Sequence, residues 1–188
     1  MYKIAKEFAF CYGHRVWSQK LNEEFSLDNK CVCRHLHGHQ GKVIVYLEGE
    51  ELTDGMVTDF KHLNWFKKFL DDALDHKFII DKNDPMYNAI IPQPAAFGLA
   101  LDSDDNVWPM NHNNLGYSII NPNVFKFLTN EEAVDILEGF VVVDFVPTSE
   151  NLSAWMHKIA QAKMDKLGVK VAQIAFFETP KSQSNYYA

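Results

Sequence analysis

The sequence predicts an α+β fold in which helices lie on one face of an antiparallel sheet. Strand-like alternation or β-branched runs occupy residues 2–10, 36–48 and 169–178, and two long segments between them have apolar residues at helical spacing. The resulting order is strand, strand, helix, insertion, helix, strand. A chain of 188 residues has the usual length of one domain, so we expect a single domain over residues 1–188.

The N-terminal part is expected to contain two strands joined by a loop. Residues 2–10 alternate loosely and predict a strand that bends at Gly13. Residues 18–34 are polar and lack a clear period, so they predict a loop. The β-branched residues within 36–48 predict the second strand.

The middle of the chain contains one helix and a long polar stretch. Apolar residues recur at helical spacing over residues 60–74, and Asp59 stands where a helix N-cap is expected. The following segment is rich in Pro, Asn, Asp and Gly and predicts an insertion at about residues 84–139 with short strands at most. A structureless loop of that length is unusual in a compact domain, so the insertion is either functional or ordered.

The C-terminal part is predicted to hold a short helix, a strand and a second long helix. Thr129 and Glu132 form a capping-box pattern before a short helix that ends at Gly139. A strand is predicted over residues 140–146, and the long helix that follows it is expected to stop at Gly168.

Composition restricts the classes of function. Lys and Arg total 18 against 25 for Asp and Glu, a net charge of −7, which argues against a dedicated nucleic-acid-binding protein. No apolar run is long enough for a transmembrane helix, and the N-terminus lacks the apolar core of a secretory signal. Three cysteines fit a reducing compartment, so we expect a cytoplasmic protein.

Histidines and cysteines are concentrated between Cys31 and His39. His37 and His39 are two residues apart, so on a strand both imidazoles point to the same face and are able to reach one metal ion. His14 follows the first strand and is the candidate third ligand. Three histidines with an open fourth position are typical of a catalytic zinc site. Two alternatives remain: a closed structural zinc site of Cys31, Cys33, His37 and His39, and a histidine-rich surface loop.

Other polar residues have both a chemical and a structural interpretation. Asp75 beside His76 would fix a histidine tautomer, or His76 would simply stabilise a helix C-terminus. Glu178 at the end of a strand would accept paired hydrogen bonds from an amidine-like group, or would be solvated. Thr148 and Glu150 suit a helix N-terminus, whose free N–H groups are also able to bind a ligand.

The ordered set of motifs resembles the 6-pyruvoyl-tetrahydropterin synthase superfamily, most closely its 6-carboxytetrahydropterin synthase branch. The resemblance covers roughly residues 2–82 and 140–187. The motifs that carry it are His14, Cys33-x-x-x-His37-Gly38-His39, Gly55-Met56-Val57-Thr58-Asp59-Phe60, Leu74-Asp75-His76, Pro147-Thr148-Ser149-Glu150-Asn151 and Glu178-Thr179.

The resemblance implies the tunnelling fold, a four-stranded antiparallel sheet with two helices on one face, in a homo-oligomer, commonly a hexamer, with active sites at subunit contacts. It implies conversion of 7,8-dihydroneopterin triphosphate to 6-carboxy-tetrahydropterin, acetaldehyde and triphosphate, in 7-deazaguanine (queuosine) synthesis. The implied roles are Zn²⁺ ligands for His14, His37 and His39, catalytic groups for Cys33, Asp75 and His76, and pterin binding for Glu178, Thr148 and Glu150.

Three departures from the family pattern leave alternatives open. The pyruvoyl branch has a Cys-x5-His-x-His spacing, which selects Cys31 instead of Cys33 and implies a 6-pyruvoyl-tetrahydropterin synthase. Gly13 stands where a small Ala is often found. The insertion is longer than expected and would fit a non-catalytic zinc- or pterin-binding assembly protein. The cations that contact the triphosphate are not readable, with Arg34, Lys30 and Lys42 as candidates.

Overall fold

A computed structural model describes residues 1–27, 29–101 and 107–188, so residue 28 in the predicted loop and residues 102–106 in the predicted insertion lie outside the description. The chain divides into two compact units. The first unit comprises Met1–Tyr12, Gly38–His76 and Thr148–Ala188, and the second unit comprises Gly13–His37 and Lys77–Pro147. Among the described residues, we find no helical segment with the length and hydrophobicity needed to span a bilayer.

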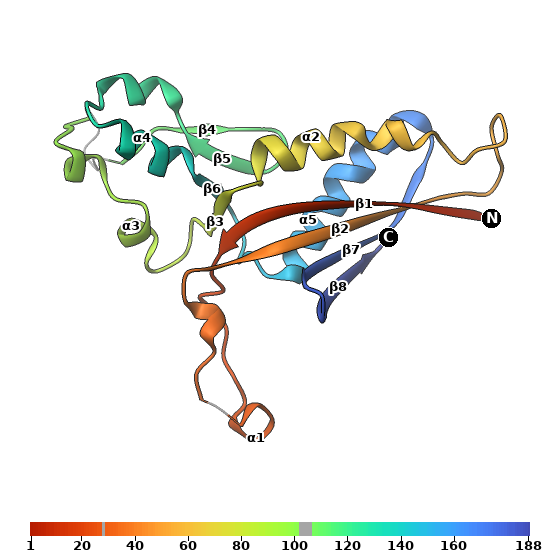
Figure 1. The fold of residues 1–188 in the computed structure, drawn as a ribbon, viewed down its shortest axis with the longest axis horizontal. Helices are drawn as coiled ribbons and strands as arrows, with labels where there is room; N and C mark the ends of the chain where they lie inside the picture. The colour runs from red at the N-terminus through yellow and green to blue at the C-terminus, as the bar shows by residue number, and fades with distance from the viewer. Residues whose placement is uncertain (28, 102–106) are drawn as a thin grey trace. The chain divides into compact units, whose positions relative to one another are not determined.

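The described residues form more strands than the sequence predicts (Figure 1). The strands are β1 (Tyr2–His14), β2 (His37–Gly49), β3 (Lys77–Asp81), β4 (Met110–His112), β5 (Tyr117–Ile120), β6 (Phe140–Val143), β7 (Lys170–Thr179) and β8 (Ser182–Tyr187). The helices are α1 (Glu23–Ser26), α2 (Asn64–Ala73), α3 (Tyr87–Ile90), α4 (Glu131–Glu138) and α5 (Ser149–Met164). The 3₁₀ turns are η1 (Val32–Arg34), η2 (Phe60–Leu63), η3 (Pro94–Phe97), η4 (Pro122–Phe127) and η5 (Asp165–Leu167).

The predicted four-stranded antiparallel sheet is wrong, although the α+β class is confirmed. The strands are ordered β4-β5-β6-β3-β1-β2-β7-β8 in one sheet. The sheet is mixed because β3 pairs with β6 in parallel, whereas the pairs β2–β7, β7–β8, β5–β6 and β4–β5 are antiparallel. The extra strands are β3, which follows α2, β4 and β5 within the predicted insertion, and β8 in a polar C-terminal segment that carries no strand signal.

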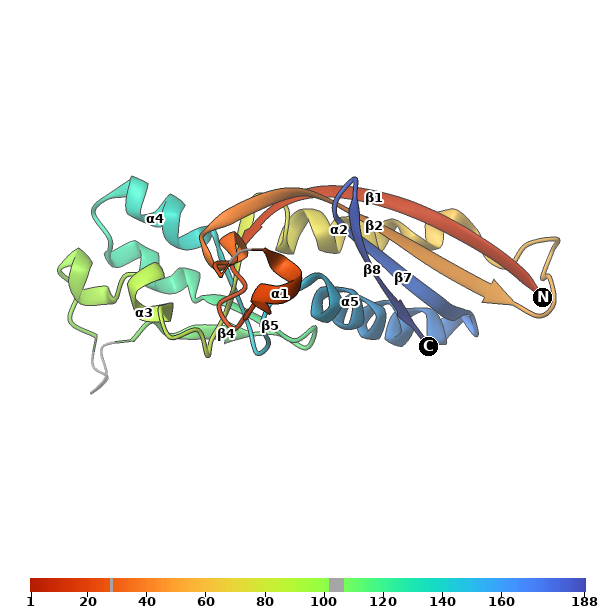
Figure 2. The ribbon, with the colours of Figure 1, turned by 90° about the horizontal axis from the view of Figure 1, so that it is seen from below.

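Side-chain alternation in the first unit defines an inward face. On β1 the side chains of Phe8, Phe10 and Tyr12 are buried, and the residues between them are more exposed. On β2 the alternation buries Val43 and Val45 in the same way. Figure 2 shows β1 and β2 running in opposite directions beside β7 and β8. This period of two is the pattern of a sheet with one face on the core.

Helices α2 and α5 pack on this inward face. Asp59 accepts a hydrogen bond from the N–H of Lys61, as the predicted cap, but the first turn is the 3₁₀ turn η2 before α2 begins. The ring of Phe66 on α2 lies 5.4 Å from that of Phe8 on β1, centroid to centroid. The neighbouring Phe69 contacts Trp155 of α5 at 5.7 Å. The ring contacts therefore join both helices to one aromatic core.

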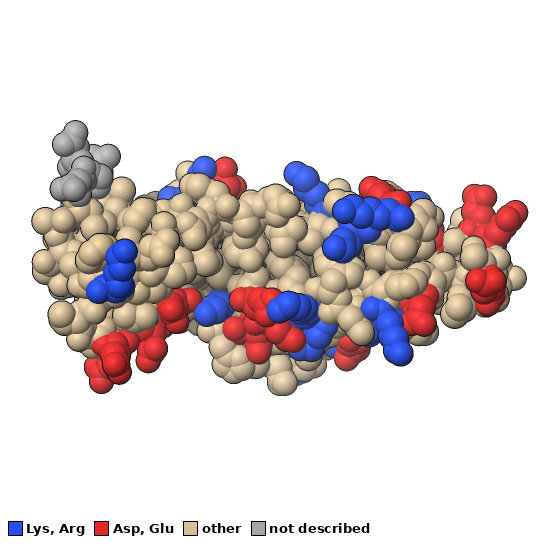
Figure 3. All heavy atoms as spheres, turned by 90° about the horizontal axis from the view of Figure 1, so that it is seen from above, with Lys and Arg blue, Asp and Glu red and all other residues tan. Residues whose placement is uncertain are grey.

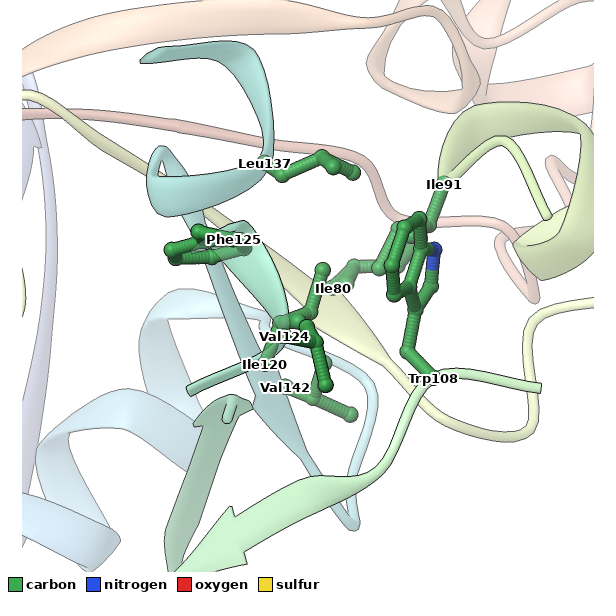
Figure 4. Close-up of a cluster of buried hydrophobic side chains, with 8 residues drawn as sticks. All are labelled: Ile80, Ile91, Trp108, Ile120, Val124, Phe125, Leu137 and Val142. Atoms are coloured by element: carbon green, nitrogen blue, oxygen red, sulfur yellow. The ribbon is translucent and has the colours of Figure 1, made fainter. Parts of the chain in front are cut away.

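The second unit has a core of its own, which shows that the predicted insertion is ordered. Eight buried side chains from β3, β5, β6, α4 and the connecting segments pack together in Figure 4: Ile80, Ile91, Trp108, Ile120, Val124, Phe125, Leu137 and Val142. The predicted cap Thr129 is wrong, because the side chain of Asn130 accepts from the N–H of Glu132 at the start of α4. The strand predicted over residues 140–146 ends earlier, at Val143.

Gly13 does not bend the first strand, contrary to the sequence-based expectation. Strand β1 continues through it to His14, which adds the last residue of the inward face. A Cβ built on Gly13 would lie 2.6 Å from Cδ2 of Phe78, closer than real Cβ atoms approach a ring carbon. Gly13 therefore serves close packing against the aromatic ring, not a turn.

Charged side chains of both signs are interspersed on the face drawn in Figure 3. On α2, for example, Lys67 pairs with Asp71, and Lys68 pairs with Asp72 one position further on. Such pairs four residues apart lie on an exposed helix face, where solvent screens them, and they contribute little to stability.

Candidate metal centre and neighbouring groups

The three predicted metal-ligating histidines lie together. His14 is the last residue of the inward-facing series on β1, and it is 1% exposed. His37 and His39 begin the inward-facing series on β2, with Gly38 exposed between them. One ligand nitrogen of each of the three histidines lies within 4.8 Å of the others. Because side chains alternate along both strands, the imidazoles lie on the same face of these strands as the buried aromatic side chains.

Hydrogen bonds to main-chain carbonyls fix two of the three rings. The Nδ1 of His14 lies 2.7 Å from the carbonyl oxygen of Pro147, and the Nδ1 of His37 lies 2.8 Å from the carbonyl oxygen of His35. A carbonyl oxygen only accepts, so both Nδ1 atoms donate and both Nε2 atoms of the neutral rings carry a lone pair. Outer partners of this kind are typical of metal-bound histidines.

The short distance between the Nε2 atoms of His14 and His37 requires a positive charge between them. The Nε2 of His14 lies 3.1 Å from the Nε2 of His37, and the ring centroids are 4.5 Å apart. Two lone pairs facing each other at this distance repel unless a cation or a proton lies between them. Two nitrogens bound at about 2.0–2.1 Å to one tetrahedral zinc ion would be about 3.4 Å apart. The donor set and its spacing therefore fit a divalent metal ion.

The alternative site of two cysteines and two histidines does not form. Among the residues that the structure describes, the group with metal-binding geometry consists of histidines alone. Because His37 and His39 lie on β2 and not in a loop, the interpretation as a histidine-rich surface loop is also wrong.

Glu178 and Tyr12 extend the site within the first unit. Burial raises the pKa of the Tyr12 hydroxyl above its ordinary value of 10.0, and the negative charge of Glu178 raises it further. Tyr12 also lies against His39, with ring centroids 5.7 Å apart. A carboxylate, a phenol and an imidazole of the three-histidine group therefore lie near one another. Sequence reasoning missed Tyr12, although its place in the series Phe8, Phe10, Tyr12 and His14 would have indicated it.

Asp75 and His76 form the expected pair at the end of α2. Asp75 accepts a 2.7 Å hydrogen bond at Oδ1 from the N–H of Cys11, and its Oδ2 lies 3.0 Å from Nδ1 of His76. The Cys11 N–H holds the pKa of Asp75 below its ordinary value of 3.8, and His76 lowers it further. The N–H of His76 donates to the Cys11 carbonyl at 2.7 Å.

The backbone at His76 is in an unfavourable conformation. Its φ is +58°, in the left-handed region that non-glycine residues rarely occupy. The side chain of His76 is 80% exposed, whereas that of Asp75 is 30% exposed. The fold therefore holds a strained residue with its imidazole accessible, a combination that is frequent at functional sites.

Cys31 and Cys33 lie in different surroundings within the second unit. The thiol of Cys31 donates to Oε1 of Gln19 at 2.8 Å. Cys33 lies inside η1, and its carbonyl accepts from the N–H of Val16 at 2.8 Å. Both thiols are free of disulfides and partly exposed. Gln19 is a second contributor that sequence reasoning missed, because it lies in a segment predicted only as a loop.

Thr148 and Glu150 are placed at the start of α5, as their structural interpretation predicts. The hydroxyl of Thr148 accepts from the N–H of Asn151 at 3.2 Å and caps the helix. Glu150 is exposed in the first turn and accepts at Oε2 from the hydroxyl of Ser149 at 3.3 Å. The residue that bears on the metal centre here is Pro147, through its carbonyl oxygen.

The chain is similar to known proteins over nearly its whole length. The chain is 28% identical over 197 aligned residues to the 6-carboxy-5,6,7,8-tetrahydropterin synthase of Aquifex aeolicus, spanning 98% of this chain and 97% of that protein. The crystal structure of an uncharacterized protein from Wolinella succinogenes is 49% identical, with a TM-score of 0.88 over 99% of this chain and 97% of that one.

More distant structures support the fold. The 6-pyruvoyltetrahydropterin synthase of Plasmodium vivax covers 100% of this chain and 97% of its own with a TM-score of 0.54 at 16% identity. A sequence profile of the family described as 6-pyruvoyl tetrahydropterin synthase matches residues 3–188. Since this match takes in nearly the whole sequence, the chain belongs to the 6-pyruvoyl tetrahydropterin synthase family.

Proposed function

We propose that the protein is a zinc-dependent lyase that converts 7,8-dihydroneopterin triphosphate and one water to 6-carboxy-5,6,7,8-tetrahydropterin, acetaldehyde and triphosphate. We further propose that it acts in cytoplasmic 7-deazaguanine (queuosine) synthesis as a homo-oligomer. The observation that carries the proposal is the pair of facing Nε2 atoms in the three-histidine group, 3.1 Å apart. The near full-length similarity to the Aquifex aeolicus enzyme directs it toward the carboxy branch.

The metal ligands proposed are His14, His37 and His39. A zinc ion bound there would act as a Lewis acid toward hydroxyl oxygens of the pterin side chain and make the adjacent C–H protons easier to remove. The chain's own contribution is orientation: Pro147 and His35 hold two ligand rings in the tautomer that leaves Nε2 available.

Glu178 is proposed to anchor the pterin ring. Its carboxylate would accept two parallel hydrogen bonds from the amino group and the ring N–H of the pterin, which fixes the reacting side chain near the metal. The buried Tyr12 hydroxyl stays protonated, because burial and the charge of Glu178 both raise its pKa. It would therefore serve as a neutral neighbour of the anchor and not as a base.

Proton transfer is assigned to Cys33, Asp75 and His76. Cys33 would remove a proton as a thiolate, with cationic neighbours favouring its ionised form. Asp75 stays ionised and accepts at Oδ2 from Nδ1 of His76, so that Nε2 of His76 remains free to give or take a proton. Thr148 and Glu150 are proposed to line the pterin site only through the N-terminus of α5.

One alternative rests on a specific residue. Cys31 has the spacing of the pyruvoyl branch, which would make the protein a 6-pyruvoyl-tetrahydropterin synthase. The hydrogen bond from its thiol to Gln19 favours a structural role for Cys31 and the carboxy branch for the protein.

A product assay tests the proposal. Purified zinc-loaded protein is incubated with 7,8-dihydroneopterin triphosphate, and the pterins, acetaldehyde and triphosphate are quantified by chromatography. We expect the carboxypterin and acetaldehyde in equal amounts, and loss of both after chelation of the metal. Formation of 6-pyruvoyl-tetrahydropterin without acetaldehyde would establish the alternative, and absence of turnover with bound zinc would contradict both.

A further inference from the structure

A pocket in the second unit is lined by cationic side chains that the proposed reaction has not used. Its volume is about 740 Å³, within the range of about 300–1,000 Å³ usual for small-molecule sites. Nine residues line it: Arg15, Gln19, Lys20, Leu21, Asn29, Lys30, Cys31, Arg34 and His35. Four of the nine are Lys or Arg, and none of these lining residues is a carboxylate. The whole chain has a net charge of −7, so the excess of positive charge is a property of this pocket and not of the protein in general.

The cations of the pocket are not equally available to a ligand. Arg15 pairs through Nε with Oδ2 of Asp84 at 2.9 Å, and the Asp84 side chain is fully buried, so this charge is largely neutralised. Lys20 is exposed and has no ion-pair partner among the described residues. Arg34 is exposed, and one N–H of its guanidinium donates to the carbonyl of Gln19 at 3.1 Å, which leaves most of its donors for an incoming group.

The walls of the pocket are tied to each other. Gln19 accepts from the thiol of Cys31 through its side chain and from Arg34 through its carbonyl. The N–H of Val16 donates to the carbonyl of Cys33, which ties the segment after β1 to the turn η1 before β2. Because these hydrogen bonds already hold part of the pocket in place, less conformational entropy is lost when an anion binds.

Two of the residues that line the pocket lie close to the proposed metal ligands in the sequence. Arg15 follows His14 directly, and His35 precedes His37 by two residues, with its carbonyl oxygen 2.8 Å from the Nδ1 of His37. Successive Cα atoms are about 3.8 Å apart, so lining residues start within about 4–8 Å of the ligand backbones. Along the chain, the lining of the pocket is thus contiguous with the proposed metal ligands His14 and His37.

We infer that this pocket binds a polyphosphate chain, the triphosphate group of the substrate, with Lys20 and Arg34 as its principal contacts. The inference rests on the proposed function for the identity of the substrate and on the pocket alone for the chemistry of the ligand. A guanidinium fork matches the paired oxygens of a phosphate, and an ammonium adds a point charge. The pterin and its tail would then be held at separate places on either side of the reacting carbons.

Inorganic tripolyphosphate is the probe for the anion site. Its binding is measured by titration calorimetry on the full chain, first stripped of metal and then loaded with zinc. We expect Lys20→Ala and Arg34→Ala each to weaken binding about 10-fold, because each removes one charge-assisted contact. Lys126→Ala is the matched control, since Lys126 is an exposed lysine of the same unit that does not line the pocket. Equal affinity in all variants, or binding only with metal present, would overturn the inference.

A kinetic measurement separates the substrate's own tail from free triphosphate. With 7,8-dihydroneopterin triphosphate, Lys20→Ala is expected to raise KM about 10-fold with kcat nearly unchanged, as for a contact made equally in ground and transition states. An unchanged KM alongside weakened tripolyphosphate binding would show that the pocket holds only the released product. Protein that binds tripolyphosphate as described but turns over no pterin would overturn the proposed function and leave the anion site standing.

Discussion

His14 and His37 direct the same ring nitrogen toward one point, and each ring is held from behind by a main-chain carbonyl. His37→Ala is therefore expected to abolish stoichiometric metal binding, measured by elemental analysis after gel filtration. Zinc at 100 times its Kd should stabilise the wild type by about 2.7 kcal/mol, a rise in Tm of about 5–10 °C. The variant should show no such rise.

The control for this measurement is another histidine of the second unit. His112 is exposed and pairs with the hydroxyl of Ser118 at 2.7 Å, outside the three-histidine group. His112→Ala should bind metal as the wild type does. Equal zinc content in His37→Ala and His112→Ala would show that the ion binds elsewhere.

The two cysteines make a second prediction at the scale of residues. Cys33→Ala should lower turnover by about 10²–10⁴-fold, the usual contribution of a positioned base. Cys31→Ala loses only the bond to Gln19 and should retain most of its turnover. The measurement is a single-turnover product assay with equal zinc content in both proteins. The reverse order of activities would assign the reaction to Cys31.

At the scale of elements, the end of α2 is fastened to β1 by a carboxylate. Asp75→Asn keeps an acceptor for the Cys11 N–H but removes the charge, and we expect a loss of about 1 kcal/mol or less at pH 7 because Asp75 is partly exposed. The pKa of Asp75 is lowered in the folded state, so its contribution is present above its ordinary value of 3.8 and is lost as the pH falls through the lower folded value.

Urea unfolding at several pH values checks this sign. The gap in unfolding free energy between wild type and Asp75→Asn should be constant near neutrality and should close below pH 3.8. A gap that widens on acidification would mean that the carboxylate destabilises the native end of α2.

The elements that could be predicted are those whose pattern is periodic. Residues 36–48, 60–74 and 169–178 match β2, α2 with its preceding turn, and β7 closely, because burial on one face leaves a period in the sequence. The strand β8 was missed because its residues Ser182–Tyr187 are mostly polar and have low strand propensity. Its backbone hydrogen bonds to β7 stabilise it instead. Thr129 was predicted as the cap from its capping-box spacing to Glu132, whereas Asn130, one position further on and an equally good N-cap, caps α4.

At the scale of the whole molecule, the second unit has a core separate from the aromatic core of the first. Trp108→Ala should destabilise the protein by about 3–5 kcal/mol, the usual cost of removing a buried aromatic. Trp108 is 6% exposed and donates through its indole N–H to the carbonyl of Pro92. Hydrogen exchange should show the largest loss of protection in residues 77–147.

An exposed aromatic of the same unit provides the comparison. Phe127 is 57% exposed, so Phe127→Ala should change stability by no more than about 0.5 kcal/mol. Equal losses for the two variants would mean that the cluster around Trp108 is not a stabilising core.

The site shows what a sequence conveys and what it omits. The grouping of His37 and His39 was predictable because a two-residue spacing on a strand has one geometric meaning, and His14 does lie together with them. Tyr12 lies on the inward face of the first strand, but its role depends on Glu178, and the role of Gln19 depends on Cys31 and Arg34, so neither residue was singled out. Long-range side-chain contacts of this kind leave no local pattern.

The acceptor for Nδ1 of His14 is the carbonyl oxygen of Pro147, an atom that every amino acid would supply at that position. Scanning mutagenesis is consequently blind to it, since any replacement at residue 147 retains the acceptor. Only chemistry on the main chain, such as an ester in place of the amide between residues 147 and 148, would weaken it. The orientation of the His14 imidazole therefore depends on the path of the backbone. It can be conserved among relatives that have a different residue at position 147.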